Sequence, residues 1–208
     1  MKIDISDKEI HEVVQRVVQN TLNLKNAPPQ PISISQHTEQ PDVTKAIRLT
    51  QQIKKTVAIG TDHGGVDLKA ILKNELLEKG YEVIDCGTDT KDSVDYPDIA
   101  QAVAKLVAGG AAWRGVIIDG AGIGSCMAAN KVPGIRAAMC YDYATAVNSR
   151  EHNDANILTL GAGLIGTNLA KQILNTWLAT EFGGGRHARR VNKITAIGQS
   201  FYKDGKVE

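Results

Sequence analysis

From Thr56 onward, short runs rich in β-branched residues alternate with longer segments of helical periodicity. This alternation is typical of a doubly wound α/β domain, in which helices connect the strands of a parallel sheet. Five runs are predicted as strands: TVAIGTD (56–62), YEVIDCG (81–87), WRGVIIDG (113–120), IRAAMC (135–140) and NILTLGA (156–162). Helices are predicted over residues 66–80, 96–110, 123–131, 141–153 and 165–182.

The residues before this pattern differ in composition. Residues 1–25 place apolar side chains at helical spacing and are predicted to form an amphipathic helix: Ile10, Val13, Val14, Val17, Val18 and Leu22. Residues 26–45 hold four of the six prolines, which favours an extended linker. The main domain is therefore predicted to span residues 46–208.

The composition excludes several classes of function. The chain has 24 Lys and Arg against 23 Asp and Glu, so nothing in its net charge of +1 favours nucleic acid or acidic membranes. Its three cysteines are widely spaced without a CxxC pair, which argues against a disulfide framework or a zinc site. No apolar run approaches the ~20 residues that span a bilayer, and we expect a soluble, cytoplasmic protein.

Polar segments follow several of the predicted elements. In parallel sheets of this type, ligands bind at the carboxyl ends of the strands. We expect GTDHGG (60–65), DCGTDT (85–90) and DGAGIGS (119–125) at those ends, together with EHNDAN (151–156), which follows the fourth helix.

The glycine-rich loop Gly120–Gly124 begins directly after a carboxylate, Asp119. A dinucleotide fingerprint is disfavoured, because Ser125 stands where its last glycine belongs and because the loop follows the third strand. A Walker loop is excluded, since no Gly-Lys-Ser/Thr follows. The backbone N–H groups are predicted to hold an anion or a developing oxyanion; a turn that serves only packing is the alternative.

Two further polar groups are candidates for the same site. Asp62 and His63 follow the first strand, where His63 suits an anion or a sugar hydroxyl, although an Asp at this place is often only a helix cap. His152 and Asn153 precede the last strand, although a lone His is more often a surface residue than an acid or base.

A basic run, GGGRHARRV, follows three glycines near the end of the domain. If a helix begins there, Arg186 and Arg190 share one of its faces. Guanidinium groups suit phosphate, whereas the plain alternative is a solvated helix face. A small phosphorylated substrate is predicted.

Six motifs, in this order, resemble the B-type ribose-5-phosphate isomerases and their galactose-6-phosphate isomerase relatives: GTDHGG, YEVIDCGT, DYPDIA, GAGIGSCMAANKVPGIRAA, SREHNDAN and GGGRHARRV. The similarity covers about residues 56–197. It implies a Rossmann-like three-layer αβα sandwich with a five-stranded parallel sheet. It also implies a homodimer or homotetramer whose active sites are shared between subunits and need no metal and no cofactor.

The resemblance implies roles for individual residues. His152 would open the furanose ring, while His63 and the two arginines would hold the phosphate. The residues implied to contact the sugar phosphate are Asp62, His63, Gly120, Ala121, Gly122, Ile123, Gly124, Asn153, Arg186 and Arg190. Ser125, Cys126 and His187 would be accessory.

The sequence departs from the family at the position of proton transfer. Relatives carry a cysteine at the position of Asp119 or a glutamate at that of Ser125, and this chain has neither arrangement. A carboxylate can act as the base of an aldose–ketose isomerase, but a free Asp has a pKa near ~4 and must be desolvated to act near neutrality. Cys126 is a rival base, and Ala121 replaces a frequent threonine.

Two alternatives therefore stay open beside ribose-5-phosphate isomerisation. The chain could isomerise galactose 6-phosphate or another hexose phosphate, or it could bind a sugar phosphate without turning it over. The amphipathic helix on its linker resembles the encapsulation peptides of bacterial microcompartment enzymes, so residues 6–22 would bind a shell protein or a co-cargo. Alternatively, that helix packs on the enzyme itself or supports a larger oligomer.

Overall fold

A computed structural model describes residues 56–202, with side chains for residues 56–200. The predicted N-terminal helix (1–25), the linker (26–45) and the first ten residues of the predicted domain (46–55) lie outside the described residues. No helix among the described residues is long and apolar enough to cross a membrane.

The strands and helices follow the predicted order, and each element with predicted bounds is shorter than predicted by one to five residues. The strands are β1 (Thr56–Thr61), β2 (Glu82–Asp85), β3 (Arg114–Asp119), β4 (Ala137–Met139) and β5 (Ile157–Gly161). The helices are α3 (Val66–Glu78), α4 (Tyr96–Ala108), α5 (Ile123–Ala129), α6 (Tyr143–Glu151), α7 (Thr167–Ala179) and α8 (Gly185–Tyr202). The helix expected if Arg186 and Arg190 are to share a face is present as α8.

The strands form one five-stranded sheet in the order β2-β1-β3-β5-β4, and every pair is parallel. From β1 the chain moves toward one side of the sheet, and from β3 it moves toward the other. The boundary between β1 and β3 is therefore the topological switch point, where open α/β sheets bind ligands.

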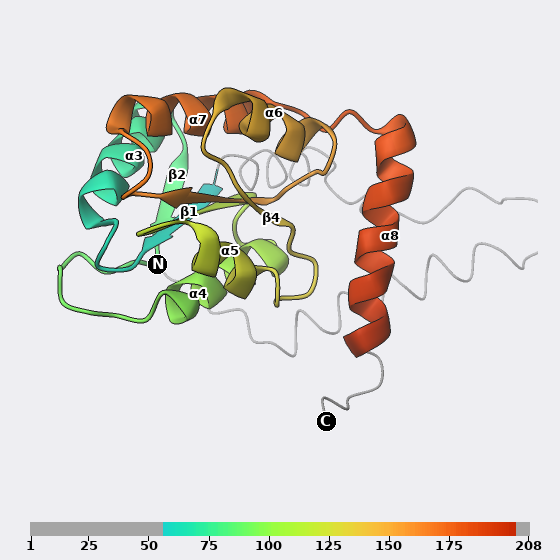
Figure 1. Cartoon of the computed structure of the whole chain (residues 1–208), viewed down its shortest axis with the longest axis horizontal. Coiled ribbons are helices and arrows are strands. Elements are labelled where there is room, and N and C mark those ends of the chain that lie inside the picture. The colour runs from blue at the N-terminus through green and yellow to red at the C-terminus, as the bar shows by residue number, and fades with distance from the viewer. Residues whose placement is uncertain (1–55, 203–208) are drawn as a thin grey trace, which may run out of the picture. The chain divides into compact units, whose positions relative to one another are not determined.

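Helices cover both faces of the sheet and complete three layers (Figure 1). Alternate residues of each strand enter two different cores, as the period of a pleated strand requires. Val116 and Ile118 of β3 pack in the core beneath α3, α6 and α7, whereas Ile117 packs in the core over α4 and α5. The predicted Rossmann-like sandwich is confirmed.

Arg114, at the start of β3, fixes the end of α7. Its guanidinium donates to the carbonyl oxygens of Trp177 and Leu178, both at 2.8 Å, and stacks 4.0 Å from the centre of the Trp113 ring. Burial, helped by the nearby charge of Arg150, lowers the pKa of Arg114 to about 10. The group remains charged at neutral pH and satisfies carbonyls that the helix end leaves unpaired.

Parallel strands give the sheet two unlike edges, called here the carboxyl edge and the amino edge. The helices return antiparallel to the strands, so a helix that starts near the carboxyl edge ends near the amino edge. α6 leads from β4 to β5 and ends at residue 151, and α7 ends at residue 179 after leaving β5. Residues 152–156 and 180–187 consequently lie at the amino edge.

Candidate active site

Asp119 ends β3 at the switch point, and only 4% of its surface is exposed. One carboxylate oxygen, Oδ1, accepts the N–H groups of Ala121 (2.8 Å) and Gly122. The other, Oδ2, accepts the N–H of Ser125 (3.0 Å) and its hydroxyl (2.6 Å). A carboxylate offers about four lone-pair positions, and all four are engaged within the chain.

The glycine loop is shaped to enclose this carboxylate. Gly122, the residue before α5, has a φ of 78°, and a Cβ there would lie 2.9 Å from the carbonyl carbon of Leu160. The turn therefore requires glycine, and successive N–H groups point at one centre, as in an anion-binding nest. The loop was predicted to present these N–H groups to a substrate, but those of Ala121 and Gly122 face Asp119 instead.

The end of β1 lies beside this loop. The Thr61 hydroxyl donates to the carbonyl oxygen of Ile118 at 2.9 Å, and a Cβ on Gly64 would lie 3.4 Å from the Gly120 nitrogen. Asp62 is buried and accepts the N–H of Gly64 at 2.9 Å, in a turn before α3. It does not cap that helix, because Gly65 is the capping residue and α3 has no side-chain cap. The exposed His63 accepts the N–H of Val94 at Nδ1, at 3.4 Å.

Tyr96 is a site residue that the sequence reasoning missed. A Cβ on Gly124 would lie 2.5 Å from Cζ of the Tyr96 ring, which places the ring directly on the glycine loop. The available signal was the motif DYPDIA, because Pro97 marks the first turn of α4 and places Tyr96 at the carboxyl edge.

A second polar group, the histidine cluster, gathers at the amino edge. His152 follows α6, and its ring stacks on that of His187 with centres 4.2 Å apart and planes 5° apart. The Asn148 amide nitrogen lies 2.9 Å from His152 Nδ1, and the Asn153 amide donates to the Asn148 side-chain oxygen at 3.0 Å. Since an amide nitrogen can only donate, the neutral His152 ring carries its proton on Nε2.

The first turns of α8 add positive charge to this cluster. Arg186 and Arg190 are exposed, and Arg186 Nε donates to His187 Nε2 at 3.4 Å. Burial, followed by the charges of His152, Arg186 and Arg190, lowers the pKa of His187. His187 is thereby kept neutral near pH 7, beside two guanidinium groups that have no carboxylate partner within the described residues.

The expectation that the EHNDAN segment lies with the other motifs at the carboxyl edge is wrong. His152 and Asn153 precede β5 and lie at the amino edge, where the N–H of Asn156 donates to the carbonyl oxygen of Arg136, just before β4. Strands of five and six residues rise about 17 and 20 Å, so the two edges are well separated. The structure thus brings Asp62, His63 and the glycine loop together, and His152, Asn153, His187 and Arg186 together, in two separate groups.

The thiol of the rival base Cys126 contacts β4. Its thiol donates to the carbonyl oxygen of Ala137 in β4 at 3.4 Å, and burial raises its pKa. A protonated thiol that faces β4 is a packing group rather than a base.

A cavity of about 620 Å³ adjoins the histidine cluster. Asn148 and Asn153 line it on the side of the cluster, Met139 contributes from β4 and Ile194 from α8. Among the described residues, no group of three or more His, Cys, Asp or Glu side chains is placed to hold a metal ion.

Comparisons with known proteins agree with the family resemblance that the six sequence motifs indicate. A family model described as Ribose/Galactose Isomerase matches residues 57–194. Ribose-5-phosphate isomerase B of Escherichia coli K12 is 47% identical over 145 residues, which are 70% of this chain and 97% of that protein. D-erythrulose-4-phosphate isomerase of Pectobacterium atrosepticum is 44% identical over 140 residues, 67% and 92% of the two chains. The solved structure of Clostridium thermocellum ribose-5-phosphate isomerase B matches with a TM-score of 0.69 at 53% identity, covering 70% of this chain and 99% of that one.

Proposed function

The chain belongs to the ribose/galactose isomerase family, and from that premise we propose that it interconverts ribose 5-phosphate and ribulose 5-phosphate. It is an enzyme of the sugar-phosphate isomerase class. The observation that supports the specific reaction best is the buried Asp119 in its glycine nest at the switch point.

The reaction moves hydrogen between adjacent carbons and consumes no second reactant. A base takes the proton from carbon 2 of the open-chain aldose, and the carbonyl oxygen on carbon 1 becomes the enediolate oxygen and is protonated. The hydroxyl on carbon 2 then gives up its proton, which balances the one gained by oxygen 1, and the base returns its proton to carbon 1 to give the ketose. The protein must supply an acid or base to open the ring, a base at carbon and donors for the enediolate oxygen. Carbon 1 is reduced as carbon 2 is oxidised within the same molecule, so the reaction needs no external oxidant or reductant. We expect activity without a cofactor and after dialysis against a metal chelator.

His152 is proposed to open the furanose ring. Its neutral ring carries the proton on Nε2, because Nδ1 accepts from Asn148, and an Nε2–H can donate to the ring oxygen as that bond breaks. Stacking on His187 fixes the plane of the ring. Arg186 and Arg190 are proposed to hold the phosphate, together with His63.

Asp119 is proposed to move the proton between the carbons. Asp119 is buried at the end of an apolar strand, and its two carboxylate oxygens accept four hydrogen bonds. For Asp119 to accept a proton, one bond must open. The Ser125 hydroxyl is the one donor of the four that can rotate away, so we assign it the role of releasing Oδ2.

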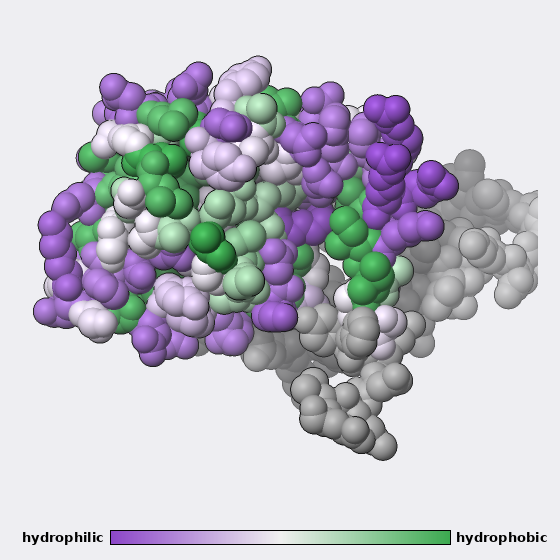
Figure 2. Space-filling view, viewed as in Figure 1, coloured by the Kyte–Doolittle hydropathy of each residue, from purple (hydrophilic) through white to green (hydrophobic). Residues whose placement is uncertain are grey.

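The separation of the two groups supports an active site shared between subunits. The carboxyl edge of one subunit would meet the histidine cluster of a second copy. Apolar side chains beside both groups are exposed: Ile123 and Met127 near the glycine loop, and Ile194 and Ile197 on α8, where Figure 2 shows a run of hydrophobic surface. Burial of such side chains is the usual driving force for association.

The direct test is turnover of ribose 5-phosphate by the purified protein, followed as ribulose 5-phosphate formed. Asp119→Asn is expected to lower kcat by about 10²- to 10⁴-fold, the range for loss of a general base. Asp92→Asn, a change at an exposed loop carboxylate, is the matched control and should leave kcat unchanged. Full activity of Asp119→Asn would remove Asp119 from the proposed role, and absence of turnover on any sugar phosphate would favour a binding subunit.

A tetrose 4-phosphate is a second candidate substrate, favoured by the similarity to D-erythrulose-4-phosphate isomerase. Its terminal hydroxyl is esterified, so it cannot close a five-membered ring and needs no ring opening.

His152→Ala should therefore impair turnover of ribose 5-phosphate while sparing D-erythrulose 4-phosphate. Comparing kcat/KM of the wild type on ribose 5-phosphate, D-erythrulose 4-phosphate and galactose 6-phosphate identifies the preferred substrate. Equal losses with His152→Ala on the first two would contradict the ring-opening role.

A further inference from the structure

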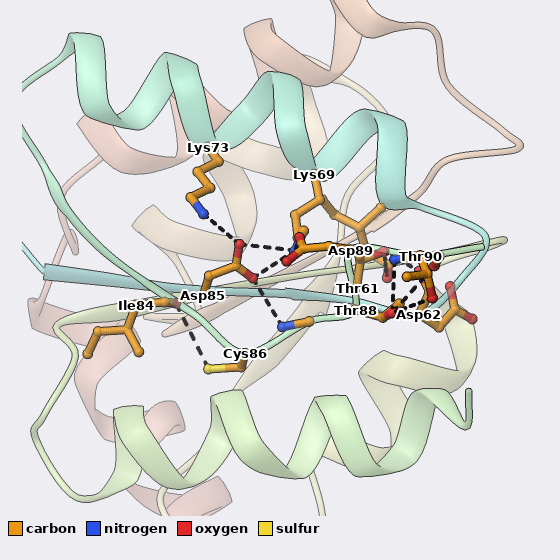
Figure 3. A network of polar contacts seen from close by, with 12 residues as sticks. Thr61, Asp62, Lys69, Lys73, Ile84, Asp85, Cys86, Thr88, Asp89 and Thr90 are labelled. Atoms are coloured by element: carbon orange, nitrogen blue, oxygen red, sulfur yellow. Dashed lines mark hydrogen bonds and ion pairs between the residues drawn. The ribbon is translucent and has the colours of Figure 1, made fainter. Parts of the chain in front are cut away.

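Lys69 of α3 is a charged residue buried in the fold, with only 1% of its surface exposed (Figure 3). Its ammonium donates to both oxygens of Asp85, at 2.9 and 3.0 Å, and to Asp89 at 2.7 Å. Burial alone would lower the pKa of Lys69, but the hydrogen bonds to Asp89 and Asp85 outweigh it and raise the pKa. The group is therefore cationic, and a buried cation is tolerated only with such partners.

The two carboxylates differ in what they contribute. Asp85, at the end of β2, also pairs with Lys73 at 2.8 Å and accepts the N–H of Gly87. Asp89 lies in the loop after β2, and its side chain is 85% exposed. Because Asp85 is shared between Lys69 and Lys73, Asp89 supplies the second negative charge of the group. The same bond ties the loop to α3. A second ion pair, Lys91 to Asp67 at 2.8 Å, ties the same loop to the same helix.

This loop, residues 86–95, is called here the strap, and it crosses the end of β1. The N–H of Cys86 donates to Ile59 and that of Thr88 to Thr61, at 2.8 and 3.2 Å, so the strap continues the pairing of β2 with β1. A Cβ on Gly87 would lie 2.4 Å from the Thr61 nitrogen, which shows how closely the strap lies on the residue before Asp62. Figure 3 shows Asp62 and Thr61 beside Thr88 and Thr90.

The far end of the strap contacts both parts of the carboxyl-edge site. The backbone N–H of Val94 donates to His63 Nδ1. Helix α4 then begins with Tyr96, whose ring lies on Gly124. Because Nδ1 accepts, the neutral His63 ring carries its proton on Nε2. That tautomer offers a hydrogen-bond donor to an anionic substrate group.

We propose that Lys69, acting through Asp89 and the strap, is a positioning residue that sets the tautomer of His63 and the place of Tyr96 on the glycine loop. The role in substrate binding rests on the proposed function. The role in fixing the His63 tautomer does not, since it concerns the protein alone.

Asp89→Ala tests this proposal and leaves Lys69 its two hydrogen bonds to Asp85. Urea unfolding of the variant verifies that the fold is retained. Asp92→Ala is the matched control: Asp92 is exposed in the same strap and makes no hydrogen bond or ion pair with any described residue. Asp89→Glu should restore most of the wild-type behaviour, because the longer carboxylate can still reach Lys69.

Two measurements on the full-length protein and its variants test the proposal. Nitrogen-15 NMR of the His63 ring should show the Nε2–H tautomer in the wild type and a mixture of tautomers in Asp89→Ala. KM for ribose 5-phosphate should rise about 5- to 10-fold in Asp89→Ala, the effect of one weakened hydrogen bond to a ligand, with a smaller change in kcat. Asp92→Ala should change neither quantity.

An unchanged His63 tautomer in Asp89→Ala would overturn the proposal, as would equal effects of Asp89→Ala and Asp92→Ala. If the wild type turns over no sugar phosphate, the proposed function fails, while the tautomer measurement still decides whether Lys69 and Asp89 position His63.

Discussion

At the scale of single residues, the carboxylate of Asp119 is the feature on which the chemistry depends. A thiolate or an exposed carboxylate would have lone pairs open to substrate, whereas Asp119 is enclosed by the loop that follows it. The enclosure explains how this chain keeps a charged group buried at the switch point: three N–H groups and a hydroxyl replace its lost hydration.

Ser125→Ala separates the proposed role of Asp119 as the base from that of the Ser125 hydroxyl as the donor that releases Oδ2. Removing the hydroxyl leaves Oδ2 with an open lone pair and retains the base, so kcat should stay within about fivefold of wild type, the scale of one hydrogen bond. Steady-state kinetics beside Asp119→Asn provides the comparison. A loss as large as that of Asp119→Asn would contradict the gating role and make Ser125 part of the proton-transfer pair.

At the scale of elements, the end of α7 depends on Arg114. Arg114→Met leaves the carbonyl oxygens of Trp177 and Leu178 without their charged donor and should lower the free energy of unfolding by about 3 kcal/mol. Urea denaturation measures this difference. Arg189→Met, on the exposed side of α8, is the matched control and should change stability by less than about 0.5 kcal/mol. Equal effects would show that Arg114 does not hold the helix end.

The arrangement of elements was largely predictable, because β-branched runs and helical periodicity mark each one separately. The edge at which His152 lies was predictable too, yet was missed: a segment that follows a helix and precedes a strand must lie at the amino edge. The strap was harder to foresee. Lys69 has the spacing of an ordinary helix residue, and only the packing of α3 on β2 shows that its ammonium is buried between two carboxylates.

At the scale of the whole molecule, acid should weaken the fold through the Lys69 network. Burial alone would raise the pKa of Asp85, but hydrogen bonds from Lys73, Lys69 and Gly87 lower it below its usual 3.8. The resulting stabilisation is present above pH 3.8 and is lost as the pH falls through the lower native value. Unfolding by urea at pH 7, 5 and 3 should show Asp85→Asn less stable than wild type at pH 7 and 5, with a smaller difference at pH 3. If the difference in unfolding free energy between Asp85→Asn and wild type were as large at pH 3 as at pH 7, the proposed link between the lowered Asp85 pKa and stability would be contradicted.

The N-terminal segment is tested by deleting residues 1–45. If residues 6–22 target a microcompartment, the shortened protein should remain folded, oligomeric and active, and should lose co-sedimentation with shells. Loss of folding or of the oligomer would instead show that the segment packs on the enzyme or supports its assembly.

The account as a whole requires that Asp119 of one subunit work with His152 of another. Asp119→Asn and His152→Ala are each expected to be nearly inactive on ribose 5-phosphate as separate homo-oligomers. When the two are unfolded together and refolded as an equal mixture, half of the dimers are mixed, and each mixed dimer contains one site with both native residues. The mixture should then recover about a quarter of wild-type activity. No recovery, in a mixture shown by mass spectrometry to contain mixed dimers, would contradict a site shared between subunits.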